Sequence, residues 1–297
     1  MMILITGCDG QLGQELQSIL TSGHSEIGPI PEELEDCDIS AVDVDELDIT
    51  DTAAVLGFVR SSAPDVIINC AAMTNVNACE SELVTAMRVN AIGPRNLALA
   101  AEEIGAKLIH VSTDYVFSGN GSVPYCEWDE TEPNTVYGKS KLLGEQYVLD
   151  TCHRAFVVRT AWLYGLVGGN FVKTMRRLGR EKGEVTVVYD QRGNPTNAND
   201  LAHHLLKLAV GEEYGIYHCT GSGECSWFDF ACKIMEYSGI ACRVNPCTTA
   251  EYPTPAPRPA YSALRNLMLE STVGDEMRPW EDALQSYCQK LNQTEQG

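Results

Sequence analysis

The chain has 297 residues, of which 44% are hydrophobic, and its formal net charge is −20. This length is enough for one large α/β unit or for two closely joined lobes. The negative charge is spread along the chain, and such a surface repels nucleic acid and anionic lipid, which excludes both as general partners. Because no apolar run is long enough to cross a bilayer, we also expect no membrane partner.

The N-terminus and the cysteines indicate the compartment. Residues 1–6 are too short and lack the basic start of a secretory signal. The twelve cysteines include no pair at Cys-x-x-Cys spacing and have no accompanying histidine cluster, which argues against a disulfide framework or a zinc site. We therefore expect a cytoplasmic protein without a bound metal, whose thiols mostly behave as small core hydrophobes. The pair His203-His204 is expected on a helix surface.

Strand-like and helix-like patterns alternate through the first half. Compact apolar runs predict buried strands, and helical spacing of apolar residues separates them. Such alternation is typical of a parallel sheet covered by helices on both faces. The strands predicted in this way are 2–6, 65–69, 107–112 and 156–160, and the predicted helices are 11–20, 51–62 and 82–104. Residues 23–42 are less regular and begin as a loop, and the second strand is expected near 38–42.

The second half is less regular. It contains strand candidates at 185–188 and 215–219, helices near 199–210 and 279–291, and a proline-rich loop at 252–259. We therefore predict a Rossmann-like, doubly wound α/β fold with a smaller, interleaved C-terminal lobe. Residues 1–160 form the first domain, and residues 161–297 mainly form the second lobe, with some segments returning to the sheet.

A glycine-rich turn follows the first strand and opens the first helix, with the sequence Gly7-Cys8-Asp9-Gly10-Gln11-Leu12-Gly13. Gly7 permits the tight turn, Gly10 lets a pyrophosphate approach the backbone, and Gly13 allows close packing of helix on strand. Gln11 and Leu12 begin the helix, whose N-terminus faces the phosphates. The alternative is an ordinary strand–helix turn, but its position at the start of an α/β chain favours dinucleotide binding.

An acid after the second strand binds the adenosine ribose in such folds, and Asp43 is the candidate here. No arginine stands beside it to hold a 2′-phosphate. The cofactor is therefore expected to be NADH or NADPH, with NADH slightly favoured. A solvated acidic loop is the competing interpretation of Asp43.

Tyr137 and Lys141 are four residues apart, which places both on one face of a helix. A nearby ammonium stabilises a phenolate and lowers the pKa of a tyrosine, so the pair can deliver a proton. Thr113 directly follows a predicted strand, at the sheet edge where ligands bind. A surface pair would explain Tyr137 and Lys141 alone, but their order after the glycine turn and Thr113 favours a catalytic set.

These residues resemble the extended short-chain dehydrogenase/reductase superfamily and, within it, the dTDP-4-dehydrorhamnose reductases. The resemblance covers nearly the whole chain. Its more selective parts are Thr-Asp-Tyr-Val-Phe at 113–117, Thr-Ala-Trp at 160–162 and Arg-Pro at 258–259. It implies that Thr113, Tyr137 and Lys141 are catalytic. It also implies cofactor contacts for Asp48, Ile49, Ala71 and Ala72, and nucleotide-sugar contacts for Thr74, Thr113, Tyr115, Trp162, Asn170 and Arg258.

Related nucleotide-sugar dehydratases usually carry Thr-Asp-Glu where this chain has Thr113-Asp114-Tyr115. Without the glutamate, Asp114 alone cannot supply both the acid and the base of an elimination. The resemblance therefore implies NAD(P)H-dependent reduction of the 4-keto group of dTDP-4-dehydro-L-rhamnose. A reductase of another nucleotide-4-keto-6-deoxysugar and a non-catalytic regulatory subunit of the same fold remain as alternatives.

Two departures from the family pattern stand out. Asn77-Ala78 occupies a position where the family often has Asp-Lys, which puts a local salt link in doubt. Some members dimerise through magnesium held by glutamates near the C-terminus, but residues 286–291 carry no acidic cluster. We therefore expect a monomer or a weak homodimer without such a metal.

Overall fold

The computed structural model describes residues 1–295; residues 296 and 297, part of the expected C-terminal lobe, lie outside the described residues. Six parallel strands form the central sheet, in the order β12-β7-β6-β5-β1-β4. This arrangement confirms the predicted Rossmann-like α/β fold. The strands are β1 (Met2–Thr6), β4 (Asp38–Val42), β5 (Val66–Asn69), β6 (Lys107–Thr113), β7 (Ala155–Thr160) and β12 (Gly215–His218).

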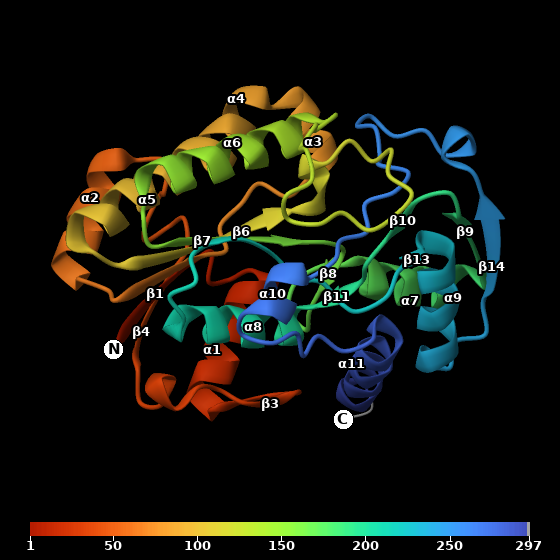
Figure 1. The fold of residues 1–297 in the computed structure, drawn as a ribbon. Helices are drawn as coiled ribbons and strands as arrows, with labels where there is room; N and C mark the ends of the chain where they lie inside the picture. The colour runs from red at the N-terminus through yellow and green to blue at the C-terminus, as the bar shows by residue number, and fades with distance from the viewer. Residues whose placement is uncertain (296–297) are drawn as a thin grey trace.

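Helices cover both faces of this sheet (Figure 1). Ile3 and Ile5 of β1 pack with α1 and α8, whereas Leu4 between them packs with α2, α5 and α6. Because both faces are covered, the central strands β1 and β5 are largely apolar and buried, which makes them recognisable as apolar runs, whereas the edge strand β4 is mixed and only partly buried. The helices are α1 (Gln11–Ser22), α2 (Thr52–Ser62), α5 (Gly93–Ile104), α6 (Val136–Thr151) and α8 (Ala198–Val210).

The direction of sheet growth reverses at β1. From β1 the chain passes to β4 on one side, and then crosses to β5 on the other. Connections that leave adjacent strands in opposite directions open a crevice beyond their carboxyl ends, where open α/β sheets bind ligands. The glycine turn follows β1, and Cys70 follows β5, so both segments border this crevice.

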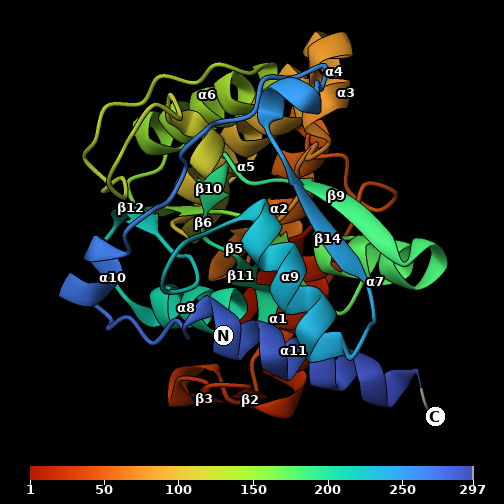
Figure 2. The same ribbon diagram turned by 90° about the vertical axis from the view of Figure 1, so that its right-hand side faces the viewer.

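A second apolar core lies beyond this end of the sheet. It is built from α7 (Phe171–Lys182), α9 (Trp227–Ser238), α11 (Trp280–Thr294) and the parallel pair β9 (Glu184–Val188) and β14 (Arg243–Cys247). Figure 2 shows these elements side by side. By contrast, α8 and β12 also come from the second half of the chain but belong to the sheet and its covering layer.

Short elements connect these layers. They are β2 (His24–Ser25), β3 (Gly28–Pro29), β8 (Leu163–Tyr164), β10 (Arg192–Gly193), β11 (Thr196–Asn197), β13 (Cys225–Ser226), α3 (Val76–Ser81), α4 (Leu83–Met87), α10 (Leu267–Ser271), the 3-10 helices η1 (Glu32–Leu34), η3 (Asp114–Val116) and η4 (Thr249–Glu251), and the π-helix η2 (Arg88–Ile92).

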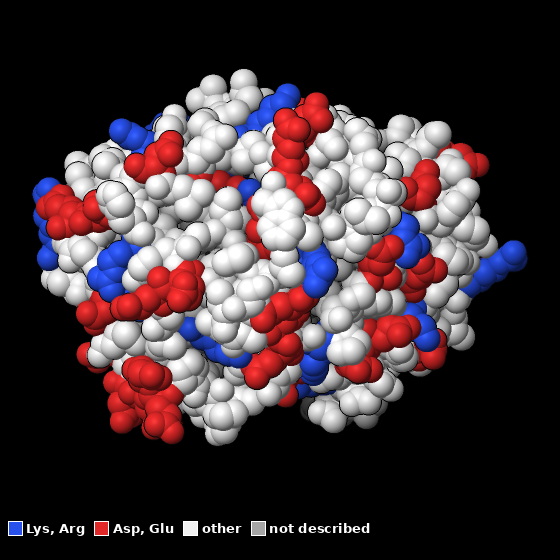
Figure 3. All heavy atoms as spheres, in the orientation of Figure 1, with Lys and Arg blue, Asp and Glu red and all other residues white. Residues whose placement is uncertain are grey.

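The charges on the surface reflect the excess of acidic residues in the sequence. On the face shown in Figure 3, lysines and arginines are scattered singly among more numerous acidic side chains. No helix within residues 1–295 is both long and apolar enough to cross a membrane. All twelve cysteines are free thiols, and seven of them are buried, in line with the expectation that most act as core hydrophobes.

The prediction that His203 and His204 lie on a helix surface is wrong. The two residues are only 4% and 0% exposed. Both ring nitrogens of His204 are used, since Nδ1 donates to the Asp200 carbonyl at 2.8 Å and Nε2 accepts from the Glu276 N–H at 3.1 Å. The helix α8 is enclosed between α1 and the segment after α10, a tertiary contact that helical spacing alone does not reveal.

These buried histidines predict destabilisation by acid. Burial lowers the pKa of His204 to about 4 and that of His218 to about 3. In the unfolded chain a histidine titrates near pH 6.5, so stability falls as the pH drops from about 6.5 towards these lower values. Each of the two residues should cost about 2 kcal/mol of unfolding free energy between pH 7 and pH 5.

Denaturant unfolding at pH 7 and pH 5 measures this loss. His204→Gln should lose about 2 kcal/mol less than the wild type over this interval. His24→Gln, at an exposed position, is the matched control and should keep the wild-type pH dependence. An unchanged pH dependence in His204→Gln would contradict the interpretation.

Candidate active site

The glycine turn joins β1, α1 and the end of β5 at very short range. Gly7 has a φ of +70°, and a Cβ there would lie 2.6 Å from the Ala71 nitrogen. A Cβ on Gly13 would lie 2.4 Å from the Gly7 carbonyl oxygen. Side chains are therefore excluded at both positions, as the sequence predicted. Gly10 precedes α1 without a side-chain cap, so the first N–H groups of the helix are left for another acceptor.

A cavity of about 570 Å³ extends from this turn across the carboxyl ends of β5, β6 and β7. It brings together most of the predicted site residues. Those that line it are Gly7, Gly10, Gln11, Leu12, Gly13, Ala72, Thr74, Thr113, Tyr115, Tyr137, Lys141 and Trp162.

The start of α6 carries Tyr137 and Lys141 into the cavity. Thr135 caps this helix, because its hydroxyl accepts the Gly138 N–H at 2.9 Å. A Cβ on Gly138 would lie 2.2 Å from the Tyr115 carbonyl oxygen, so this glycine lets α6 pack tightly on η3. Tyr137 is 9% exposed and Lys141 only 2%, and the Lys141 ammonium donates to the Val111 carbonyl at 2.6 Å.

Burial controls the protonation of this pair. It raises the pKa of Tyr137 above its usual value, although the neighbouring Thr113 hydroxyl partly offsets the effect. The sequence had predicted the opposite direction, because it took account of the Lys141 charge and not of desolvation. Burial also lowers the pKa of Lys141 to about 8, against the attraction of Glu145. Near neutral pH, Tyr137 therefore carries its proton and can donate it.

Thr113 ends β6 and lies 5% exposed beside two polar groups. Its hydroxyl donates to Asp114 Oδ1 at 3.0 Å and accepts the Tyr115 N–H at 3.2 Å. Asp114 is 3% exposed, and its other carboxylate oxygen has no hydrogen-bond partner among the described residues. Burial raises the pKa of Asp114 to about 6, so this carboxyl group exchanges its proton close to neutral pH.

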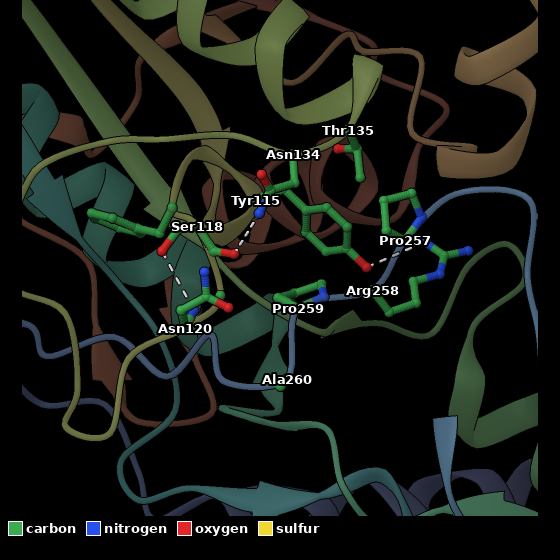
Figure 4. A pocket seen from close by; sticks show the side chains of 11 residues that line it. Tyr115, Ser118, Asn120, Asn134, Thr135, Pro257, Arg258, Pro259 and Ala260 are labelled. Atoms are coloured by element: carbon green, nitrogen blue, oxygen red, sulfur yellow. Dashed lines mark hydrogen bonds between the residues drawn. The ribbon is translucent and has the colours of Figure 1, made fainter. Parts of the chain in front are cut away.

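Tyr115 connects the catalytic set to the proline-rich loop. Its ring meets that of Tyr137 edge-on, with centroids 5.5 Å apart. Figure 4 shows the Arg258 guanidinium directed at the Tyr115 hydroxyl, which accepts its hydrogen bond at 3.2 Å. Arg258 also donates to Asn77 Oδ1 at 3.0 Å. Asn77, one of the departures from the family pattern, thus helps to hold the arginine in place.

Trp162 forms the wall opposite the glycine turn. It has a φ of +46°, which is strained for a bulky residue, and such strain concentrates at functional sites. Its ring stacks on Trp227, with centroids 3.5 Å apart and an interplanar angle of 8°. A Cβ on Gly193 would lie 2.7 Å from the Trp162 ring, so the ring is held from the other side as well.

A second cavity of about 380 Å³ adjoins the first, and both include Tyr115 and Trp227 in their linings. Apolar and aromatic side chains dominate it, and Arg258 lines it as well, hydrogen-bonded to Tyr115, which lines both cavities. The remaining lining residues are Phe171, Met175, Thr186, Val187, Val188, Gln191, Tyr252 and Thr254.

Comparison with known proteins decides the family. Residues 1–293 match the family model described as RmlD substrate binding domain. The chain is 44% identical to the dTDP-4-dehydrorhamnose reductase of Mycobacterium tuberculosis strain H37Rv, over 95% of this chain and 90% of that protein. The chain belongs to the dTDP-4-dehydrorhamnose reductase family.

Solved structures of this family have the same fold. The dTDP-4-dehydrorhamnose reductase of Clostridium acetobutylicum is 47% identical, with a TM-score of 0.93 over 98% of this chain and 99% of that one. The Bacillus anthracis enzyme, solved in complex with NADP, is 42% identical, with a TM-score of 0.90 over 97% of this chain and 99% of that one.

Other predicted site residues lie outside the lining of the first cavity. Asp43 follows β4, and its carboxylate accepts the Asp9 N–H of the glycine turn at 3.1 Å. Asp43 also lies close to Cys8 and Asp9. Each of the three residues offers one atom of a kind that can bind a metal ion, and these atoms lie within 4.8 Å of one another. Asp48 accepts the Thr50 N–H at 2.8 Å, and Ile49 is buried.

Asn170 caps α7 by accepting the Lys173 N–H at 3.0 Å. Its amide also donates to Gln11 Oε1 at 3.0 Å and to the Gly165 carbonyl at 2.9 Å. In this arrangement Asn170 ties the glycine turn to the C-terminal lobe. Any contact between Asn170 and the sugar stays a prediction.

Sequence reasoning missed Trp227, Asn77 and Gln191 as site residues. Each comes from a segment that only the fold brings to the cavities, and none belongs to a recognised motif. The sequence does carry a signal at Asn77, because Asn77-Ala78 departs from the Asp-Lys pattern of the family.

Proposed function

We propose that this chain uses a reduced nicotinamide cofactor to convert dTDP-4-dehydro-L-rhamnose into dTDP-L-rhamnose. The observation that carries the proposal is the buried, protonated Tyr137 beside Thr113, in a cavity that begins at an uncapped, glycine-lined helix N-terminus. Membership of the reductase family supports the same substrate.

The first cavity suits a dinucleotide. Its volume falls in the usual range for cofactor sites, and the N–H groups at the start of α1 are placed to donate hydrogen bonds to a pyrophosphate. Ala72 and Thr74, which follow β5, line its continuation towards Tyr137. The bound cofactor supplies a hydride to carbon 4 of the sugar.

The protein delivers the proton that completes the reduction. Tyr137, as general acid, transfers its proton to the oxygen on carbon 4, while Thr113 orients that oxygen. The Lys141 ammonium then stabilises the phenolate left on Tyr137. Tyr115 stands where related dehydratases carry a glutamate, so the site lacks the second carboxylate that elimination needs.

The second cavity suits the nucleotide half of the substrate. Phe171, Met175 and Trp227 offer apolar and aromatic faces for the base, and Gln191 offers a polar amide. Arg258, which lines the second cavity and donates to Tyr115, supplies positive charge to the diphosphate in a chain whose net charge is −20.

Tyr137→Phe tests the proton-transfer role. The variant keeps the ring but loses the acid, so the rate of cofactor oxidation with the 4-keto sugar nucleotide should fall at least ~100-fold. Absorbance loss of the reduced nicotinamide measures it. Tyr147→Phe, on the same helix, is the matched control and should retain wild-type turnover. Near-normal turnover by Tyr137→Phe would rule out the mechanism.

We further propose that NADH is accepted at least comparably to NADPH, because the Asp43 carboxylate repels a 2′-phosphate at the end of β4. Steady-state kcat/KM with each cofactor measures the preference. Asp43→Asn should shift the ratio towards NADPH by about tenfold, a size typical of one lost charge contact. Asp45→Asn is the control. A wild-type preference for NADPH well above tenfold, unchanged in Asp43→Asn, would remove this role.

A further inference from the structure

The helix α6 buries a third polar side chain behind the catalytic pair. Tyr137, Lys141 and Glu145 are spaced four residues apart, so all three share one face of the helix. Glu145 is 1% exposed, and its partner Arg159, from β7, is 2% exposed. Arg159 donates to the Glu145 carboxylate from Nη2 at 2.7 Å and from Nε at 3.0 Å. Ser112 donates a further, short hydrogen bond to the same carboxylate.

Of this group, Ser112 lines the first cavity, whereas Glu145 and Arg159 are not part of its lining. Ser112 is the residue before Thr113 on β6, and Lys141 donates to the carbonyl of Val111, the residue before Ser112. The Glu145 carboxylate therefore hydrogen-bonds to β6. This strand also ends at Thr113 and provides the carbonyl that accepts the Lys141 ammonium. The arrangement ties α6, β6 and β7 together directly behind the reacting groups.

A buried ion pair is a costly way to join a helix to a sheet, because desolvation usually outweighs the attraction between the two charges. Apolar side chains of similar volume would serve at least as well. The pair therefore calls for a reason other than stability, and its position one turn beyond Lys141 supplies one. Arg159 also has contacts on its far side, with the Phe117 ring at 5.2 Å and the Glu127 carbonyl at 3.4 Å.

The groups facing Lys141 leave Glu145 as its main counter-charge. Tyr137, from the same helix, is protonated near neutral pH. His110, on β6, is fully buried, and burial together with Lys141 lowers its pKa well below the usual range, so it is neutral. Burial raises the pKa of the Cys70 thiol, after β5, to about 12, so it is neutral too. Glu145 is the acid that favours the charged form of Lys141.

We propose that Glu145, held by Ser112 and Arg159, is a positioning residue that keeps Lys141 as an oriented ammonium in the buried site. This role rests on the proposed function, in which that ammonium supports Tyr137. Glu145 itself does not touch substrate or cofactor. Its carboxylate acts through Lys141, and Arg159 and Ser112 fix where the carboxylate lies.

The role has a signature that a purely structural ion pair lacks. The pKa of Lys141 is about 8, so processes that need its ammonium should decline above that pH. Removing a neighbouring carboxylate destabilises the ammonium, which should move this decline to lower pH by about one unit or more. A lost structural contact would instead reduce activity by the same factor at every pH.

The test measures binding of NADH by fluorescence, and kcat/KM for the 4-keto sugar nucleotide, from pH 5.5 to 9.5. The variants are Glu145→Gln and, in case an unpaired Arg159 prevents folding, the double variant Glu145→Gln/Arg159→Met. We expect the alkaline decline in both measurements to move down by about one pH unit or more, with values at pH 6 within fivefold of wild type. Glu145→Asp should largely restore the wild-type profile.

Arg176→Met is the control, because it removes another buried arginine from its ion pair, here with the exposed Glu295, away from α6. It should lower stability without moving either pH profile. A uniform loss across the pH range, with an unmoved decline in the Glu145 variants, would overturn the proposal. Because NADH binding is measured separately, a wild type that binds NADH but does not turn over would count against the proposed function alone, and a shifted binding profile would still support the role of Glu145.

Discussion

The close contact of backbone with backbone at Gly7, Ala71 and Gly13 is the constraint on which the site depends. At these points β1, α1 and the end of β5 approach so closely that a single Cβ would meet backbone atoms at 2.4 to 2.6 Å. The contact lies where the sheet changes its direction of growth. It therefore sets both the position of the helix N-terminus that faces the cavity and the distance from that helix to the catalytic strand.

Burial then determines the chemistry at the other end of the cavity. Tyr137 and Lys141 are almost entirely removed from water, which favours the neutral form of each. A neutral tyrosine is the form that a ketone reduction requires, since the proton must be present before the hydride arrives. A neutral lysine would be of no use to the resulting phenolate, and this conflict gives the Glu145–Arg159 pair its importance.

Much of this arrangement is predictable from the sequence. The sequence pattern predicted the five central-sheet strands within residues 1–160, though not the short strands β2 and β3, and the glycine turn, Thr113, Tyr137 and Lys141 all line one cavity as predicted. Local patterns sufficed because each of these features depends on spacing within one segment. Trp227, Asn77 and Glu145 were not found, because their importance arises from contacts between segments far apart in the chain. The buried positions of His203 and His204 and the direction of the Tyr137 pKa shift were missed for the same reason, since both depend on burial.

Hydride transfer to carbon 4 of a nucleotide-linked ketosugar can be followed with an isotope label. The 4-keto sugar nucleotide is supplied with reduced nicotinamide carrying deuterium at the transferable position, and the product is analysed by NMR. We expect dTDP-L-rhamnose with one deuterium on carbon 4. Deuterium on another carbon, a product with the opposite configuration at carbon 4, or no deuterium in the product would contradict this expectation.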